Sequence, residues 1–229
     1  MYIMDVKNKE TNINAKLERV DKILVSQNLG SRKEVHGFIK KGNLKINGEK
    51  IKKVDFKVNP EKDEMILFDK AVNFKRYIYI MMNKPSGVLS ANRDKREKTI
   101  IDLIPSELYR RNLFPAGRLD RDTTGLMIIT DDGDFCHNML SPKKKVYKLY
   151  HARVDKKVTQ QDINVFKKGI ILNDGTEFLP SELAILEDGE KPLVSVRICE
   201  GKFHQVKLMF AATQKKVLSL KRVQIGQLA

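Results

Sequence analysis

Residues 116–126 read Ala-Gly-Arg-Leu-Asp-Arg-Asp-Thr-Thr-Gly-Leu and place a carboxylate, Asp120, between two arginines on a turn bounded by glycines. The apolar run at 125–130 follows directly and predicts a buried strand, which ends at the turn-forming triplet of residues 131–133. A carboxylate held against fixed cations stays ionised and in place, as a nucleophile or proton acceptor must. The residues alone leave two interpretations open, a reactive carboxylate and an ordinary salt-bridged turn.

The same segment resembles a family motif. Gly-Arg-Leu-Asp at 117–120, followed by Thr-Thr-Gly-Leu at 123–126, is similar to the signature of pseudouridine synthases, and specifically of the RsuA-like branch that modifies ribosomal RNA. In that family the Asp of the motif is catalytic, so the resemblance implies a catalytic Asp120. It further implies substrate or RNA contacts from its neighbours, with the arginines gripping phosphates or bracing the loop: Arg118, Arg121, Thr123 and Thr124.

A tyrosine on a later strand is the second expected catalytic residue. The family carries a Lys-x-Tyr sequence there, and its tyrosine ring packs on the uracil. Two tyrosines of this chain fit, Tyr147 and Tyr150. Tyr150 is preferred because residues 150–154 continue in the family's pattern, and Tyr147 remains the alternative.

The third expected catalytic residue lies in the segment 200–210. It resembles the family motif in which a basic residue approaches the catalytic Asp, and Lys207 occupies that position. His204 and Gln205 are expected to contact RNA. The apolar residues of the segment are expected to build the core or the wall beside the base: Phe203, Val206, Met209 and Phe210. Residues 203–207 are most similar to the type that acts on the small subunit, which favours 16S rRNA, with 23S rRNA as the alternative.

The composition points to a polyanionic partner. The chain of 229 residues has 44 Lys and Arg against 29 Asp and Glu, a formal charge of +15. Nucleic acid is the first partner that such a charge predicts. An anionic membrane surface is the weaker alternative, because the sequence lacks a basic amphipathic helix with a large apolar face.

Other classes of site are not expected. Two cysteines exclude a disulfide scaffold and fit a reducing compartment. The four histidines do not pair with cysteine at zinc spacing, so no metal site is expected. Neither a glycine-rich phosphate loop nor an apolar run of about 18 residues occurs, so we expect no nucleotide cofactor, no membrane span and a cytoplasmic location.

The N-terminal part predicts a small domain over residues 15–72, after a flexible tail over 1–14. Apolar residues recur at helical spacing in a first helix: Leu17, Val20, Ile23 and Leu24. Ser31 and Glu34 form a capping-box pattern for a second helix. Asn47-Gly48 predicts a hairpin, and a further strand is expected at 65–68. The helix-helix-hairpin order resembles an S4 RNA-binding domain, which implies that these basic residues contact RNA phosphates: Arg19, Lys22, Arg32, Lys33 and Lys41.

Residues 73–229 are expected to form the larger domain. Strands are expected at 77–82, 125–130, 147–154, 170–172, 194–198 and 217–220, and helices near 99–104, at 159–168 and at 204–212. Strands and helices mix without strict alternation, which favours an α+β fold over a doubly wound one. The expected architecture is a small helix-helix-hairpin domain followed by a mixed, mainly antiparallel sheet flanked by helices.

The resemblance implies isomerisation of a uridine in ribosomal RNA to pseudouridine, without a cofactor. The expected partner is 16S rRNA, alone or as an assembly-stage ribonucleoprotein, and the protein is expected to be a monomer. The alternative from another class is a non-catalytic S4-type assembly factor, since a fold can outlive its chemistry.

Overall fold

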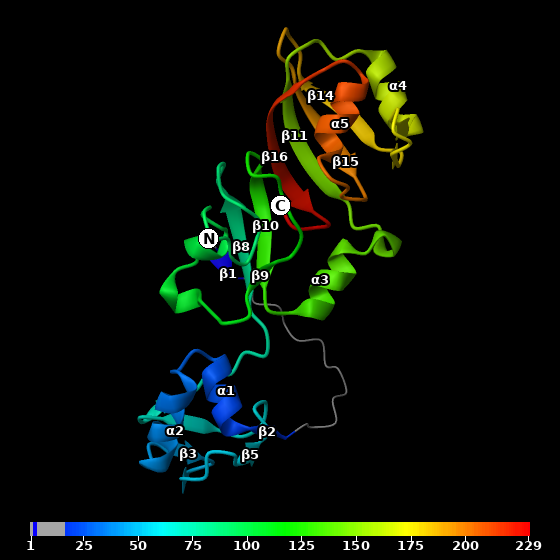
Figure 1. Ribbon diagram of the computed structural model, residues 1–229. Coiled ribbons are helices and arrows are strands. Elements are labelled where there is room, and N and C mark those ends of the chain that lie inside the picture. The colour runs from blue at the N-terminus through cyan, green and yellow to red at the C-terminus, as the bar shows by residue number, and fades with distance from the viewer. Residues whose placement is uncertain (1, 4–16) are drawn as a thin grey trace. The chain divides into compact units, whose positions relative to one another are not determined.

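The computed structural model describes residues 2–3 and 17–229, which divide into two compact units (Figure 1). The small unit comprises residues 17–78 and 104–113, and the large unit comprises the other described residues. Residues 104–113 thus group with the small unit, although they lie within the range 73–229 expected for the larger domain. The flexible tail expected over 1–14 lies outside the described residues except for Tyr2–Ile3 (β1), which pairs with a strand of the large unit.

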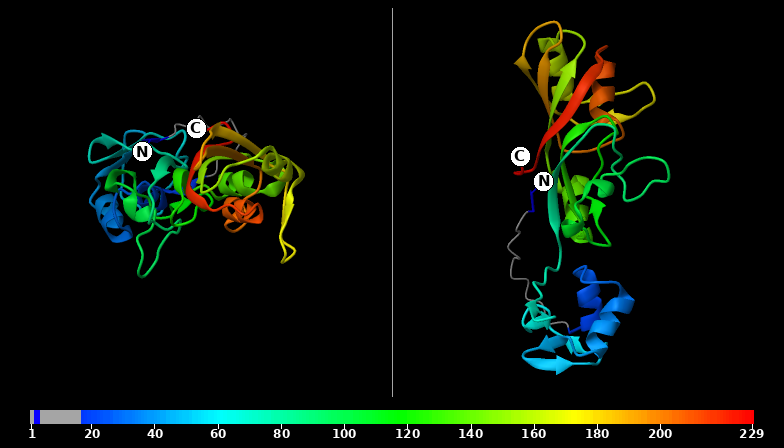
Figure 2. Two further views of the ribbon diagram at one scale, coloured as in Figure 1. Left: turned by 90° about the horizontal axis from the view of Figure 1, so that it is seen from above. Right: turned by 90° about the vertical axis from the view of Figure 1, so that its left-hand side faces the viewer.

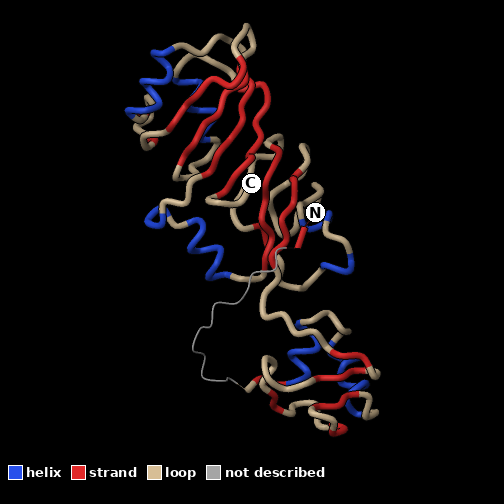
Figure 3. Tube along the Cα trace, turned by 180° about the vertical axis from the view of Figure 1, so that it is seen from behind, coloured by secondary structure: helices blue, strands red, loops and turns tan. Residues whose placement is uncertain are grey.

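Two helices and two small sheets make up the small unit (Figure 3). Its elements are β2 (Glu18–Arg19), α1 (Val20–Ser26), α2 (Arg32–Lys40), β3 (Leu44–Ile46), β4 (Glu49–Ile51), β5 (Lys57–Val58), β6 (Met65–Leu67) and β7 (Lys70–Ala71). The predicted capping box is confirmed, because the Ser31 N–H donates to Glu34 Oε2 at 2.8 Å and the Glu34 N–H donates to Ser31 Oγ at 3.3 Å. The β3–β4 hairpin turns at Asn47-Gly48, both with positive φ, as a two-residue turn of this kind requires.

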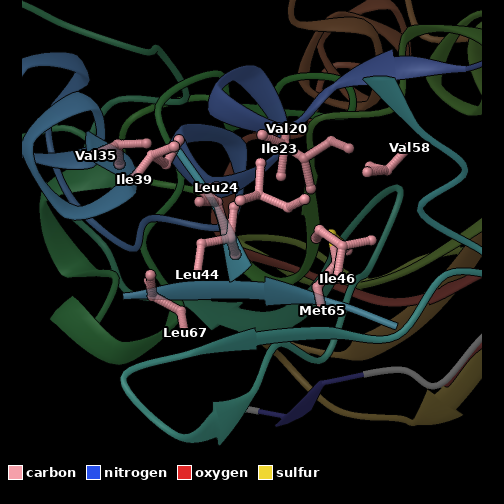
Figure 4. Packing of buried hydrophobic residues seen from close by; sticks show 11 residues of the cluster. Val20, Ile23, Leu24, Val35, Ile39, Leu44, Ile46, Val58, Met65 and Leu67 are labelled. Atoms are coloured by element: carbon pink, nitrogen blue, oxygen red, sulfur yellow. The ribbon is translucent and has the colours of Figure 1, made fainter. Parts of the chain in front are cut away.

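The core of the small unit joins both helices to the four-stranded sheet β4-β3-β6-β7 (Figure 4). Its main side chains are Val20, Ile23 and Leu24 from α1, Val35 and Ile39 from α2, and Leu44, Ile46, Met65 and Leu67 from the strands. Leu17, expected on the first helix, is instead 56% exposed. The chain is extended at β2, and α1 begins only at Val20.

An eight-stranded sheet dominates the large unit (Figures 1 and 3). The remaining strands of the chain are β8 (Tyr79–Lys84), β9 (Phe114–Pro115), β10 (Thr124–Thr130), β11 (Lys148–Val154), β12 (Ile170–Ile171), β13 (Glu177–Phe178), β14 (Glu182–Glu187), β15 (Leu193–Ile198) and β16 (Val217–Ile225). The order is β1-β8-β10-β16-β11-β15-β14, with β9 also on β10, while β12 and β13 form a separate pair. Within the described sheet, β10–β16 is the parallel pair and the others are antiparallel. The predicted α+β class with a mainly antiparallel sheet is confirmed.

Helices α4 (Gln160–Lys168) and α5 (Gln205–Ala212) lie side by side on one face of this sheet (Figures 1 and 2). Phe166 and Phe210 are fully buried between them, with ring centroids 5.0 Å apart. The helix expected near 99–104 is a 3₁₀ turn at Ile101–Leu103, and two further 3₁₀ turns lie at Ser106–Leu108 and Pro142–Lys144.

Helix α3 (Gly133–Leu140) was not predicted. The triplet at 131–133 was interpreted as a turn, but Asp132 caps a helix there by accepting a hydrogen bond from the N–H of Phe135 at 2.9 Å. Aspartate favours both turns and helix N-caps, so the residue type alone does not separate the two.

Candidate active site

The loop that carries Asp120 connects β9 to β10, and a buried lysine fixes its backbone. Lys84, the last residue of β8, is fully buried. Its ammonium donates three hydrogen bonds of 3.0 Å to the carbonyl oxygens of Pro85, Arg121 and Thr123. Two of these acceptors lie within three residues of Asp120, so Lys84 holds the backbone on which this carboxylate stands.

Sequence reasoning missed Lys84. The strand expected at 77–82 ends before this position, and lysine is almost never fully buried, so its residue type gave no signal. Burial lowers the pKa of Lys84, although the charges of Asp122 and Asp120 act in the opposite direction. The three carbonyl acceptors compensate part of the cost of placing an ammonium group in the interior.

We expect Lys84→Met to lower the free energy of unfolding by about 2–4 kcal/mol. Methionine fills a similar volume but leaves the buried Thr123 carbonyl and the partly buried Pro85 and Arg121 carbonyls without their donor. An unsatisfied buried acceptor costs about 1–3 kcal/mol, and we expect the combined loss to exceed the relief of no longer burying a charge. Urea denaturation of the full chain measures the effect. Lys95→Met, at an exposed lysine of the same unit, should change stability by less than about 0.5 kcal/mol. Equal stability of the two variants would contradict the assigned role of Lys84.

Asp120 contacts Lys207 of α5 and His204, the residue that precedes α5. The Lys207 ammonium lies 2.9 Å from Asp120 Oδ2 and 2.7 Å from Asp122 Oδ1, and His204 Nε2 lies 3.5 Å from Asp120 Oδ1. Burial acts to lower the pKa of Lys207, but its hydrogen bonds to Asp122 and Asp120 outweigh burial and raise it. The Lys207 hydrogen bond lowers the pKa of Asp122. One lysine therefore stays charged between two carboxylates.

The arginines that flank Asp120 in sequence have other surroundings. Arg121 pairs with Glu97 at 2.9 Å and donates through Nε to the Gly87 carbonyl at 3.3 Å, so it braces the loop. Arg118 is exposed and lines a pocket beside Asp120. The cation that faces Asp120 closely is thus Lys207, which is 87 positions away in sequence, in place of an adjacent arginine.

The pocket beside Asp120 also contains the preferred tyrosine. It is lined by Arg118, Leu119, Asp120, Thr123, Tyr150, Ile198, Gly201, Lys202, His204, Gln205, Val206 and Leu220. Tyr150 lies on β11 and is 8% exposed, so its ring forms part of the pocket wall. Tyr147 precedes β11, is 38% exposed and has the Arg197 guanidinium 4.0 Å from its ring centroid. The geometry brings Tyr150, and not Tyr147, together with Asp120.

Gln205 and Thr124 make hydrogen bonds that stabilise the segments around the pocket. Gln205 is buried; its amide donates to Glu200 Oε1 at 2.7 Å and accepts from the Lys202 N–H at 3.0 Å. These bonds hold the loop before α5, and the RNA contact expected of Gln205 stays a prediction. The Thr124 hydroxyl donates to the Leu220 carbonyl at 3.4 Å and links β10 to β16.

The apolar residues of the 200–210 segment divide into two groups. Val206, Met209 and Phe210 are buried, as expected for core positions. Phe203 is 78% exposed, so the prediction that it belongs to the core or to an apolar wall is wrong. It precedes α5 on a loop, where helical spacing does not apply.

The small unit carries the expected basic residues on and around its helices. Arg32, Lys33, His36, Gly37 and Lys40 line a recess along α2, and Lys22 and Lys41 are exposed. Arg19 donates twice to Asp21, through Nε and Nη2, both at 3.0 Å.

Asp21 joins Arg19 to a residue that the sequence did not single out. Its carboxylate is buried and lies 2.9 Å from His36 Nε2. Burial acts to raise the pKa of Asp21, but the hydrogen bonds from Arg19 and His36 outweigh it, and the pKa is lowered. A lone histidine on a basic helix carries no motif, so only the structure reveals this link.

Residues 2–3 and 17–229 contain no cluster of three or more His, Cys, Asp or Glu side chains placed to hold a metal ion. Within the same residues, no helix is long and apolar enough to cross a bilayer.

Comparison with known domain families gives two matches. The family described as RNA pseudouridylate synthase matches residues 78–212, and the S4 domain family matches residues 18–64. The first match contains the Asp120 loop, Tyr150 and Lys207, and the second contains most of the small unit.

Three similar proteins and one solved structure are each described as a pseudouridine or pseudouridylate synthase. An uncharacterized RNA pseudouridine synthase of Bacillus subtilis is 39% identical over 92% of this chain and 89% of its own length. The ribosomal small subunit pseudouridine synthase A of Vibrio cholerae is 36% identical over 92% and 89%. The ribosomal large subunit pseudouridine synthase B of Bacillus subtilis is 30% identical over 90% and 84%. A crystal structure of a pseudouridylate synthase superposes with a TM-score of 0.62 at 34% identity, covering 93% of this chain and 90% of that one.

Proposed function

Because this chain belongs to the RNA pseudouridine synthase family and carries an S4 domain, we propose that it isomerises one uridine of ribosomal RNA to pseudouridine, in the small-subunit rRNA. One observation carries the proposal. The Asp120 carboxylate, paired with the Lys207 ammonium at 2.9 Å, lines the same pocket as the Tyr150 ring. A carboxylate, a cation and an aromatic surface are the groups that this reaction needs.

The reaction moves the ribose from one atom of the uracil to another. The N1–C1′ bond breaks, the base turns while bound, and a C5–C1′ bond forms. C5 then loses its hydrogen to solvent and N1 gains one, so atoms balance without an oxidant or a second substrate. The target base must first leave its stack, at a cost of a few kcal/mol, which is smaller in loops and junctions of folded RNA.

Asp120 has two possible roles in this sequence of steps. As a nucleophile it attacks C1′ and releases the uracil; as a base it removes a ribose proton. In both roles the carboxylate acts beside the Lys207 ammonium, which lies 2.9 Å from Asp120 Oδ2. Tyr150 offers its ring face to the uracil and holds the base while it turns.

The small subunit is favoured over the large one by two observations. Residues 203–207 are similar to the small-subunit type of motif, and the small-subunit relative is 36% identical against 30% for the large-subunit relative. The S4 domain then serves as the module that docks on RNA. Its exposed Lys22, Arg32, Lys33 and Lys41 would contact phosphates, as would Arg19, which also pairs with Asp21. Phosphate contacts set affinity and register but not sequence choice.

We expect deletion of the gene to remove one pseudouridine from 16S rRNA and to leave 23S rRNA unchanged. Mapping pseudouridine in both rRNAs, with and without a plasmid copy of the gene, measures this. Loss of a 23S site with 16S intact would overturn the small-subunit assignment in favour of the large-subunit alternative.

A non-catalytic assembly factor is the alternative from another class. Purified protein incubated with rRNA tritiated at uracil C5 distinguishes it, since the isomerase releases one tritium per product. Binding without release, on both naked rRNA and assembly-stage particles, would favour the binding-only function.

A further inference from the structure

An exposed aromatic side chain, Phe203, lies in sequence between Lys202 and His204, which both line the candidate pocket. Phe203 is 78% exposed, more than any other large apolar side chain among residues 17–229. A single exposed apolar residue is common and needs no explanation. What distinguishes Phe203 is that its ring is stacked on the ring of His204, with centroids 3.8 Å apart and planes inclined by 18°. One face of the phenyl ring is occupied, and its exposure leaves the opposite face open to solvent.

The His204 ring of this stacked pair lies next to the Asp120 carboxylate. His204 lines the pocket with Asp120 and Tyr150, and its Nε2 lies 3.5 Å from Asp120 Oδ1. Phe203 therefore stacks on the histidine that contacts the candidate catalytic carboxylate. An RNA strand that delivers a flipped uridine to this pocket must place the adjoining nucleotides at its rim.

The loop that presents Phe203 is held on both sides. The Lys202 N–H donates to the buried Gln205 amide, and the Lys202 ammonium donates to the Glu177 carbonyl. His204 adopts a left-handed backbone conformation, with φ of 48°, immediately before α5. A ring on such a braced loop loses little conformational freedom when a ligand stacks on it, which favours binding.

The surroundings favour a nucleobase over an apolar protein partner. The residues next to Phe203 in sequence are all exposed and are polar or glycine: Gly201, Lys202 and His204. They form no contiguous apolar patch of the size that protein interfaces use. Unpaired bases stack on aromatic side chains in proteins that bind single-stranded RNA.

We propose that Phe203 is a stacking platform for the unpaired base next to the target uridine, and so positions the RNA strand for the reaction. This rests on the proposed function. Stacking on a phenyl ring tolerates any base, so Phe203 adds affinity and placement rather than sequence choice. Tyr150 faces the target base itself, and Phe203 takes its neighbour.

Steady-state tritium release from C5-labelled 16S rRNA gives the first test. We expect Phe203→Ala to raise KM about 10- to 100-fold, as loss of one base stack does, with kcat within about threefold of the wild type. Phe203→Tyr should restore KM because it keeps the aromatic face. Phe203→Leu should not, although it keeps an apolar side chain. Equal KM values for the Leu variant and the wild type would overturn the proposal.

Fluorescence gives a second test that does not depend on catalysis. The chain contains no tryptophan, so Phe203→Trp introduces a single indole at the platform. A single-stranded RNA heptamer should quench its emission, while an RNA duplex at equal phosphate concentration should not. The matched control is Leu186→Trp on the edge strand β14, where the side chain is 48% exposed. The β14–β15 register places it at the far end of that pair from Ile198, which lines the pocket.

The two tests separate this inference from the function on which it rests. Quenching confined to Phe203→Trp, without tritium release by the wild type, would support the platform and reject the enzyme. Tritium release by the wild type with unchanged KM for Phe203→Ala and no quenching would reject the platform and keep the enzyme. Equal quenching of the Phe203 and Leu186 variants would show nonspecific contact and also reject the platform.

Discussion

Replacing Asp120 with asparagine is expected to lower tritium release from C5-labelled rRNA at least about 1,000-fold, as removal of a nucleophile or an essential base does. Asparagine has nearly the same shape but carries no charge, so it can neither attack C1′ effectively nor take up a proton. RNA affinity should change little, because the expected phosphate contacts of the small unit do not involve this residue.

The fold should survive this substitution. Lys207 keeps its second partner, Asp122, at 2.7 Å. The lost pair with Asp120 is partly exposed, and such pairs contribute about 0–1 kcal/mol. Thermal unfolding should therefore show a nearly unchanged midpoint, which separates lost chemistry from lost structure.

The matched control is Asp122→Asn. Asp122 lies on the same loop and contacts the same ammonium, but it does not line the pocket and its side chain is 71% exposed. We expect its release rate to fall less than about tenfold. An Asp120→Asn variant within tenfold of the wild type would remove Asp120 from the catalytic role.

Gly125→Ala is expected to destabilise the large unit by about 3–5 kcal/mol. Gly125 lies in β10 with φ of +104°, between Lys84 on β8 and Arg222 on β16. A Cβ atom there would lie 2.1 Å from the Arg222 carbonyl oxygen and 2.8 Å from the Arg222 nitrogen. Both contacts are with backbone, so the two strands must separate, and the steric cost adds to the strained φ of a non-glycine residue.

Chemical denaturation compares this variant with Gly133→Ala. Gly133 is the first residue of α3, and a Cβ there would meet nothing within 4 Å. Alanine is the better helix former, so the control should be neutral or up to about 1 kcal/mol more stable. A Gly125→Ala protein that unfolds together with the wild type would show that the β10–β16 contact can relax at little cost.

Local signals made much of the fold predictable from sequence. The capping pair Ser31 and Glu34 and the Asn47-Gly48 turn act within a few residues, and the structure confirms both. Asp132 also acts locally, but it served a helix where a turn was expected. Residues that favour both turns and helix caps, such as Asp132, indicate where a strand or helix ends. They do not indicate whether a turn or a helix follows.

The candidate site was predictable only in part, because its parts come from distant segments. The motif resemblance selected Asp120, Tyr150 and Lys207, and the structure brings the carboxylate, the ring and the ammonium to one place. Residue type misled at Lys84, where a charged side chain is fully buried. It misled in the opposite sense at Phe203, where a phenyl ring is exposed. At Lys84, backbone carbonyls from a separate loop override the preference of the side chain, and among the described residues the Phe203 ring stacks only on the adjacent His204.

The chain cannot be divided into its two units at one position, because residues 104–113 belong to the small unit. This segment groups with the small unit, where Arg110 donates to the Ser26 and Lys75 carbonyls at 2.9 and 3.0 Å. The chain then returns to the large unit at 114, six residues before Asp120. A fragment that begins at residue 79 would contain residues 104–113 but would lack the Ser26 and Lys75 carbonyls to which Arg110 donates. Exchange of the S4-containing unit between related proteins must therefore replace residues 17–78 and 104–113 together.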